Sequence, residues 1–192
     1  MYNLPHKDLS DPNDKYNFPL FKTIKVDDEV VVFLEKTLEL YKSENSGTRV
    51  PQFQTSKDSY RCGNFLLWDN SEFNKFKDTV LIDLYSKHLN ISSNKIDIMW
   101  SHALDYGSGA LMSPHKHMHN EDFGILIYLS DCDDGQTQFY LNDHNDGSRI
   151  RTKYRLTPRK GFGACFSSMV LHEGLFSIEG KRMFVSGVRI NV

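Results

Sequence analysis

The sequence predicts a single, mainly β domain of the α+β class: a β-sandwich or open barrel in jelly-roll order, with N-terminal helices packed against one sheet. The chain has 192 residues, 39% of them hydrophobic, enough for one domain with a sizeable core. Two segments of the first half have helical periodicity, and after residue 95 short apolar or alternating runs are separated by Gly, Asn and Asp. Because no repeat or linker divides the chain, we expect one domain over 1–192, with an arm and helices in 1–95 and a jelly-roll core in 96–192.

The first half is expected to contain an arm and two helices. The segment 1–24 carries half of the six prolines together with turn-forming pairs, which favours an extended arm packed on the domain. A helix is predicted over about 28–43, because apolar residues such as Val30 and Phe33 recur at helical spacing and Asp27 precedes them as a plausible N-cap.

A second helix is predicted over about 71–89, with Phe73 and Phe76 on its apolar face and Asn70 or Ser71 as its N-cap. Beyond it, the apolar and alternating runs predict strands, and the clearest breaks between them are GSGALMSP, DCDDGQ and NDHNDG. The candidate strands are 96–105, 123–130, 137–142, 149–156, 161–167 and 182–191.

Composition excludes several classes of protein. The net charge is -2, with 23 basic and 25 acidic residues and no block of like charge, so no nucleic-acid partner is implied. Cys62, Cys132 and Cys165 are far apart and form no CxxC pair, which favours a reducing, cytoplasmic location over a disulfide framework. We expect no export signal and no membrane span, because no run of about 18 apolar residues occurs. The oligomeric state is not readable.

A histidine cluster, SPHKHMHNEDF at 113–123, is the strongest chemical signal. On an extended strand, His115 and His117 would point to the same side, because side chains alternate with period two. A mononuclear iron site needs two histidines and usually a carboxylate on one face, with open positions for co-substrate and oxygen. His172 is the obvious further ligand. A histidine-rich loop can also be simply solvated, and the cluster alone does not decide between these readings.

Four stretches of the second half, in order over residues 100–191, resemble a known family: YGSGALMSPHKH, ILIYLSDCDDGQTQF, TPRKGFGACFSSMVLH and EGKRMFVSGVRI. They resemble the iron(II) and 2-oxoglutarate-dependent oxygenases, in particular the prolyl-4-hydroxylase-like branch. The first stretch is similar to that family's run of Tyr, Gly and then Pro-His-x-Asp, and the second to its strand-turn-strand. The third is similar to the approach to the distal histidine, and the fourth to the basic residue and strand that close the fold. The resemblance implies a double-stranded β-helix, a fold that cupins share.

The resemblance also implies a non-haem dioxygenase that uses Fe(II), O2 and, as co-substrate, 2-oxoglutarate. The expected reaction is hydroxylation of an unactivated C–H bond, coupled to decarboxylation of 2-oxoglutarate to succinate. His115 and His172 match the family's iron-binding histidines. Arg182 matches the basic residue that grips the distal carboxylate of 2-oxoglutarate, with Lys181 as the nearby competitor. The remaining co-substrate residues implied are Tyr128 and Ser186 at the same carboxylate and Tyr106 towards the other end. Tyr128 could instead be a core tyrosine, and Arg182 a surface residue at a strand edge.

The sequence departs from the family where His-x-Asp is expected, because His117 stands in place of the aspartate. Three accounts are open. In the favoured one, His117 itself binds iron and the site consists of His115, His117 and His172. In the second, Glu121 or Asp122 supplies the carboxylate. In the third, the register shifts so that His119 and Glu121 form the pair.

Two other classes of function stay open. GALMSPHKHMHNE also resembles the first cupin motif, which would make Glu121 a fourth ligand beside the three histidines in a metalloenzyme that does not use 2-oxoglutarate. A jelly-roll binding module without catalysis would hold no metal. The substrate, a small molecule or a peptide, is not identified, because selectivity resides in loops that match nothing.

Overall fold

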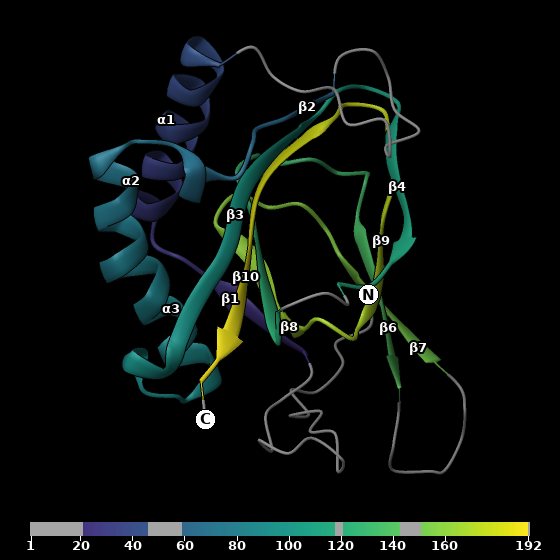
Figure 1. Cartoon of the computed structure of the whole chain (residues 1–192). Helices are drawn as coiled ribbons and strands as arrows, with labels where there is room; N and C mark the ends of the chain where they lie inside the picture. The colour runs from purple at the N-terminus through teal and green to yellow at the C-terminus, as the bar shows by residue number, and fades with distance from the viewer. Residues whose placement is uncertain (1–20, 46–58, 118–120, 143–150, 192) are drawn as a thin grey trace.

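The computed structural model describes residues 21–45, 59–117, 121–142 and 151–191 (Figure 1). In this part of the chain the strands form two antiparallel sheets. The six-stranded sheet has the order β1-β8-β5-β10-β3-β2, and the four-stranded sheet has the order β4-β9-β6-β7. The strands are β1 Phe21–Lys25, β2 Tyr60–Arg61, β3 Ile96–Tyr106, β4 Ala110–His115, β5 Phe123–Tyr128, β6 Thr137–Asn142, β7 Arg151–Leu156, β8 Phe162–Ser167, β9 Leu171–Ser177 and β10 Lys181–Ile190.

The helices lie on one side of the six-stranded sheet, and the four-stranded sheet lies on the other (Figure 1). They are α1 Asp28–Glu44, α2 Ser71–Phe76 and α3 Ile82–Leu89, with a π-helical turn at Lys77–Leu81 joining α2 to α3 and short 3-10 turns at Phe65–Leu67 and Ser93–Lys95. The prediction of two helical segments packed against one sheet is therefore confirmed. Asn70 caps α2 by accepting a hydrogen bond from the backbone N–H of Phe73, whereas Asp27 precedes α1 without a side-chain cap.

Two hydrophobic cores follow from the alternation of side chains along the central strands. On β5, Ile125 and Ile127 belong to the core between the sheet and the helices, while Leu126 and Tyr128 belong to the core between the two sheets. β10 alternates in the same way, with Met183 facing inwards. Along β10, neighbouring side chains point to opposite faces of the sheet. A shift of one residue in the strand therefore decides which side chains face the second sheet and which face the helices.

The six predicted strands are present, but four strands were not predicted. β1 pairs with β8 at the end of the expected arm, whose first 20 residues lie outside the described part of the chain. β2 is a two-residue edge strand. β4 begins within GSGALMSP, which was predicted as a break, and β9 lies in a segment with no predicted strand; they carry His115 and His172. The predicted strand 149–156 begins outside the described residues and is described from Arg151.

Two findings bear on the compositional predictions. All three cysteines are buried and carry free thiols. Of the helices in the described ranges, none combines the length and the apolarity that a membrane crossing requires.

Candidate functional site

His115 and His172 face each other across two neighbouring strands. They are directly paired in the β4–β9 register, and their ring centroids are 4.3 Å apart. Directly opposed residues on antiparallel strands share a face, so the pairing fixes both imidazoles on the inner side of the four-stranded sheet. The two missed strands therefore bring together histidines that are far apart in sequence.

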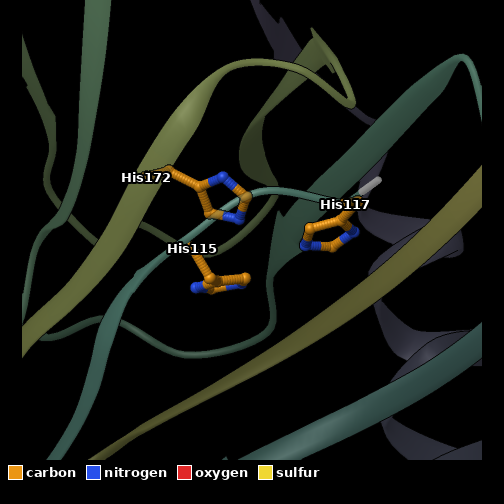
Figure 2. A group of neighbouring side chains, drawn as sticks. All are labelled: His115, His117 and His172. Atoms are coloured by element: carbon orange, nitrogen blue, oxygen red, sulfur yellow. The ribbon is translucent and has the colours of Figure 1, made fainter. Parts of the chain in front are cut away.

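His117 joins this pair from just beyond the end of β4. Its backbone N–H donates to the Ser168 carbonyl, 3.0 Å away, and its ring centroid lies 5.2 Å from that of His115 and 5.0 Å from that of His172. One nitrogen from each of the three rings lies within 4.8 Å of the others. Figure 2 shows the three rings turned towards a common space. Because β4 ends at His115, the alternation of side chains along a strand does not place His117; the backbone hydrogen bond to Ser168 holds it beside the cluster.

Each of the three imidazoles uses Nδ1 for a protein contact. Nδ1 of His115 lies 2.9 Å from the Ser113 carbonyl, and Nδ1 of His172 lies 2.9 Å from the Val170 carbonyl. A carbonyl oxygen only accepts, so both Nδ1 atoms are assigned a proton and both Nε2 atoms keep a lone pair. Nδ1 of His117 is 3.0 Å from Oε1 of Glu121. The arrangement leaves three Nε2 atoms as ligands, the pattern in which metal-binding histidines are oriented by acceptors on their other nitrogen.

The electrostatics of the cluster favour neutral imidazoles. Burial lowers the pKa of His172 to about 3, and the charge of His115 adds to the effect. Burial also lowers the pKa of His115. Because a metal ion requires unprotonated histidine, these two side chains are in the ligand form at neutral pH.

The two acids that could have supplied a carboxylate are held elsewhere. Glu121 contacts His117, and among the described residues the group that could hold a metal consists of three histidines alone. Burial acts to raise the pKa of the Glu121 carboxyl, but hydrogen bonds from His117 and Trp100 outweigh it and the pKa is lowered. Asp122 accepts through Oδ2 from the backbone N–H of Ile190, 2.8 Å away. His119, on which the third account depends, lies outside the described residues.

Gly187 makes room for the tryptophan that holds Glu121. It pairs with Trp100 between β10 and β3, and a Cβ at Gly187 would lie 2.5 Å from two atoms of the indole. Only glycine allows this close approach, because real Cβ contacts are essentially never so short. Each of these residues therefore helps to position the next. Gly187 leaves room for Trp100, Trp100 and His117 hydrogen-bond to Glu121, and Glu121 orients the ring of His117.

The histidines line a cavity of about 840 Å³ between the two sheets. Tyr106 and Thr137 also line it, as does Gly174, which follows His172 on the same face of β9. A Cβ at Gly174 would meet Nζ of Lys181 at 3.6 Å. Lys181 is only 3% exposed, its Nζ lies 5.4 Å from the ring centroid of Tyr106, and it donates to the Gly135 carbonyl. A buried ammonium group thus stands beside the cavity wall, next to Gly174, which is two residues along β9 from His172.

The prediction for Arg182 is wrong as to its position. Its guanidinium lies on the opposite face of β10, against α1, with NH1 3.4 Å from Glu39 and NH2 3.7 Å from Glu35, and 35% of its side chain is exposed. Neighbouring residues on a strand point to opposite faces, so placing Lys181 inwards directs Arg182 outwards. The competitor, Lys181, is the basic residue next to the cavity. Burial lowers its pKa to about 8, while the charges of Cys132 and Asp134 raise it.

Two further predicted contacts with a co-substrate are not supported. The hydroxyl of Tyr128 is fully buried and lies 2.6 Å from Oγ1 of Thr137 and 3.0 Å from the Leu156 carbonyl, so Thr137 stands between this tyrosine and the cavity. Ser186 borders the cavity, but its hydroxyl lies 3.0 Å from Oγ of Ser101 and donates to the Trp100 carbonyl. Tyr106, which was predicted to contact the other end of the co-substrate, lines the cavity on the Lys181 side.

Two cavity residues, His102 and Thr137, had no signal in the sequence, whereas Arg61 and Asn64 lie in the stretch RCGNFLLWDN, which the sequence suggests as a candidate cavity lining as readily as ordinary packing. Arg61 belongs to a strand of only two residues, and Asn64 to the turn that follows it. His102 and Thr137 occupy alternate positions of predicted strands, where only the phase of the strand would have indicated that they face inwards.

Comparisons with solved structures identify the fold. A prolyl-4-hydroxylase from Pseudomonas putida superposes with a TM-score of 0.67 at 15% identity, covering 90% of this chain and 94% of that one. A prolyl hydroxylase from Trichoplax adhaerens, in complex with a peptide fragment of hypoxia inducible factor, gives 0.61 at 16% identity, with coverages of 89% and 84%. The α-ketoglutarate-dependent epimerase SnoN of nogalamycin biosynthesis gives 0.69 at 10% identity, with coverages of 89% and 78%.

The sequence itself matches no protein-family model and no curated protein. At such identities the structural likeness establishes the fold, and function has to be argued from the site. The chain has the double-stranded β-helix fold of the iron(II) and 2-oxoglutarate-dependent oxygenases, with His115, His117 and His172 clustered in the wall of its cavity.

Proposed function

We propose that this protein is an iron(II) and 2-oxoglutarate-dependent oxygenase that hydroxylates its substrate. In this proposal the metal is held by His115, His117 and His172, and the distal carboxylate of 2-oxoglutarate by Lys181. The observation that carries the proposal is the convergence of three imidazoles in the wall of a cavity, with one nitrogen of each within 4.8 Å of the others and a buried ammonium group beside that wall.

The donor set fits ferrous iron. Three neutral imidazoles on one side of a metal leave its remaining positions open, which is what a co-substrate and oxygen require. Iron bound there would supply oxygen activation, coupled to decarboxylation of 2-oxoglutarate to succinate. The residues of this chain supply the rest: they orient the imidazoles, enclose the cavity and hold the far end of the co-substrate.

The Lys181 end of the cavity suits a carboxylate. Lys181 pairs with Tyr106 across β10 and β3, and Thr137 pairs with Gly174 across β6 and β9, so these four residues surround one region. Lys181 offers charge and the donors that the Gly135 carbonyl does not use, and the hydroxyls of Thr137 and Tyr106 are further hydrogen-bonding groups. Tyr128 supports this end indirectly, because its hydroxyl binds that of Thr137.

Replacing Gly174 with valine is expected to block 2-oxoglutarate binding, by about 100-fold or more, while the metal still binds. A Cβ at this position would have ordinary contacts of 3.4 Å to Cβ of Met112 and 3.6 Å to Nζ of Lys181, but two further methyl groups would occupy the path between His172 and the ammonium group. Gly174→Ala is the control, with a much smaller effect. Calorimetric titration of both variants checks this, and undiminished binding to Gly174→Val would place the co-substrate elsewhere.

The affinity for 2-oxoglutarate is expected to fall as pH rises through about 8, the pKa of Lys181. Both carboxylates of the co-substrate stay ionised, so only the protonated amine attracts them: affinity is at its plateau below this pH and falls by up to about tenfold per pH unit above it. A bound carboxylate raises the pKa, which moves the midpoint upwards. Titrations between about pH 7 and 9 test this, and Lys181→Arg should give a flat profile because arginine stays charged. A flat profile in the parent would contradict the assignment.

Metal analysis followed by thermal unfolding with and without 2-oxoglutarate tests the proposed function. Saturating 2-oxoglutarate, at about 100 times its Kd, should raise the melting temperature of the metal-loaded protein by about 5–10 °C. Metal binding without an effect of 2-oxoglutarate would favour a cupin-type metalloenzyme, and absence of both would favour a binding module. With a substrate in hand, a product heavier by one oxygen atom identifies hydroxylation, whereas an epimerase such as SnoN would leave the mass unchanged.

A further inference from the structure

One cation in the cavity wall has no part in the proposed function. Arg61 on β2 pairs with Leu104 on β3, and Leu104 belongs to the core between the sheets. Directly paired residues share a face, so Arg61 lines the cavity, where it is half-buried. No carboxylate of the described residues forms an ion pair with it. Burial lowers the pKa of Arg61, but a guanidinium stays charged at neutral pH.

Asn64 adds a second donor to the same wall. Its Oδ1 accepts from the backbone N–H of Ser101 at 3.0 Å and from that of Leu66 at 3.2 Å. Two donors at one atom identify it as the oxygen, so the orientation of the amide is fixed and Nδ2 carries the donors that remain. Asn64 lines the cavity, and in the described part of the chain no acceptor binds Nδ2. A guanidinium and an amide thus offer donors three residues apart.

The charge balance of the described cavity wall favours an anion. Its cations are Arg61 and the exposed Lys116 at the rim, and its carboxylate is Glu121, which already binds His117 and Trp100. His102 stands beside Arg61 but adds no charge, because burial and the charge of Arg61 hold its pKa well below the usual range. An anion at this wall would meet the unpaired guanidinium without facing a free carboxylate.

Arg61 and Lys181 occupy different places. Lys181 pairs with Tyr106 from β10, whereas Arg61 lies on β2, on the far side of β3 and at the edge of the sheet. On the same face of β3, His102 stacks on Trp100 at 4.9 Å, and Trp100 lies 5.5 Å from the ring of His117. Burial raises the pKa of Tyr106, which lies beside Lys181, and lowers that of His102, and the charge of Arg61 acts to lower the pKa of both. From Arg61 the wall continues through His102 and Trp100 to the histidine cluster, and a substrate would lie along it.

From these contacts we infer that Arg61 and Asn64 bind a carboxylate group of the substrate. The inference rests on the proposed function and narrows its substrate class to carboxylic acids, either small molecules or peptides that present a free carboxylate. Arg61 makes the charged contact, Asn64 adds a hydrogen bond, and the substrate is held beside the three histidines while Lys181 holds 2-oxoglutarate.

The test uses matched probes: N-acetyl amino acids with a free carboxylate, each compared with its carboxamide. Binding is measured by thermal shift and calorimetry on the full chain loaded with Zn(II) and 2-oxoglutarate, so no turnover is needed. At least one acid should bind the parent about 10- to 100-fold more tightly than its amide, the range expected for a charge-assisted hydrogen bond. Arg61→Gln should abolish this preference and leave the amide unaffected. Arg61→Lys should retain part of it, and the surface variant Arg159→Gln should retain all of it.

Three outcomes would overturn the inference. In the first, the parent binds 2-oxoglutarate but binds no acid more tightly than its amide. In the second, Arg61→Gln still binds the acid more tightly than the amide. In the third, Arg61→Gln weakens the binding of 2-oxoglutarate as strongly as a substitution at Lys181 does, which would make Arg61 the residue that binds the co-substrate carboxylate. A parent protein that 2-oxoglutarate does not stabilise would instead contradict the proposed function. Unfolding of Arg61→Gln without ligand shows whether the variant is folded.

Discussion

Replacing Lys181 with alanine is expected to weaken 2-oxoglutarate binding by about 100-fold or more, whereas replacing Arg182 with alanine should leave it within about twofold. Lys181 is buried beside the cavity, and removing it leaves a carboxylate in a low-dielectric site without its cation. Arg182 faces α1 and the glutamates there, so its removal costs surface ion pairs worth at most about 1 kcal/mol. Calorimetric titration of both variants gives the comparison directly.

Stability has to be measured beside affinity, because Lys181 is also part of the fold. Removing a buried cation relieves its desolvation but leaves the Gly135 carbonyl without its donor. Lys181→Met keeps the apolar stem and is the matched variant: it should lose the co-substrate as Lys181→Ala does, with less change in melting temperature. If Arg182→Ala loses 2-oxoglutarate while Lys181→Met binds it, the orientation of β10 is not the one described.

The one-residue difference between Lys181 and Arg182 shows what the sequence could and could not predict. The pattern of β10 is apolar on both faces, because helices cover one side and the second sheet covers the other. Such a strand has no polar face to reveal its phase. Its position is set by the turn after β9, where Gly180 has a φ of +83°. Spacing from His172 therefore allowed either residue, and the register decided between them.

Two of the strands that sequence reasoning missed, β4 and β9, carry histidines of the site. β4, with the sequence ALMSPH, and β9, with LHEGLFS, contain proline, glycine and histidine where apolar residues would mark a strand, and both are partly exposed. Polar residues that face a cavity interrupt the alternation of apolar and polar residues from which strands are predicted. Predictions from sequence patterns are therefore expected to fail at functional sites. The histidines were identified by their chemistry and by resemblance, in spite of the local pattern.

Tyr128 illustrates a different limit. The prediction that it lies on β5 and faces inwards is correct, but the four-stranded sheet places Thr137 against its hydroxyl. The hydroxyls of Tyr128 and Thr137 both face inwards, and contacts between the two sheets decide that the one of Thr137 reaches the cavity. A single sequence contains no signal for contacts between sheets. For Arg61, the sequence left a cavity lining and ordinary packing equally open, and the pairing of a two-residue strand with β3 brings it to the cavity wall.

His117→Ala is expected to reduce metal affinity by several orders of magnitude, whereas Glu121→Gln should reduce it by about 10- to 100-fold. The difference follows from their positions: Nε2 of His117 can bind the metal directly, while Glu121 lies 3.0 Å from Nδ1 of His117 and orients its ring. Glutamine keeps a hydrogen bond at this position but loses the negative charge. Titration of metal-free variants with Fe(II) or Co(II) under anaerobic conditions measures both effects.

His117→Asp is the variant that separates three histidines from a hidden carboxylate. If position 117 binds the metal, aspartate restores the His-x-Asp pattern of the resembling family, and this variant should bind metal far better than His117→Ala. If Glu121 were the true ligand, His117→Ala would keep most of its affinity and Glu121→Gln would lose it. Nδ1 of all three histidines already contacts an oxygen acceptor, so we expect the first result: in the proposed site an imidazole stands where the resembling family has a carboxylate ligand, and the acid lies on the far side of that imidazole, where it would orient the ring instead of binding the metal.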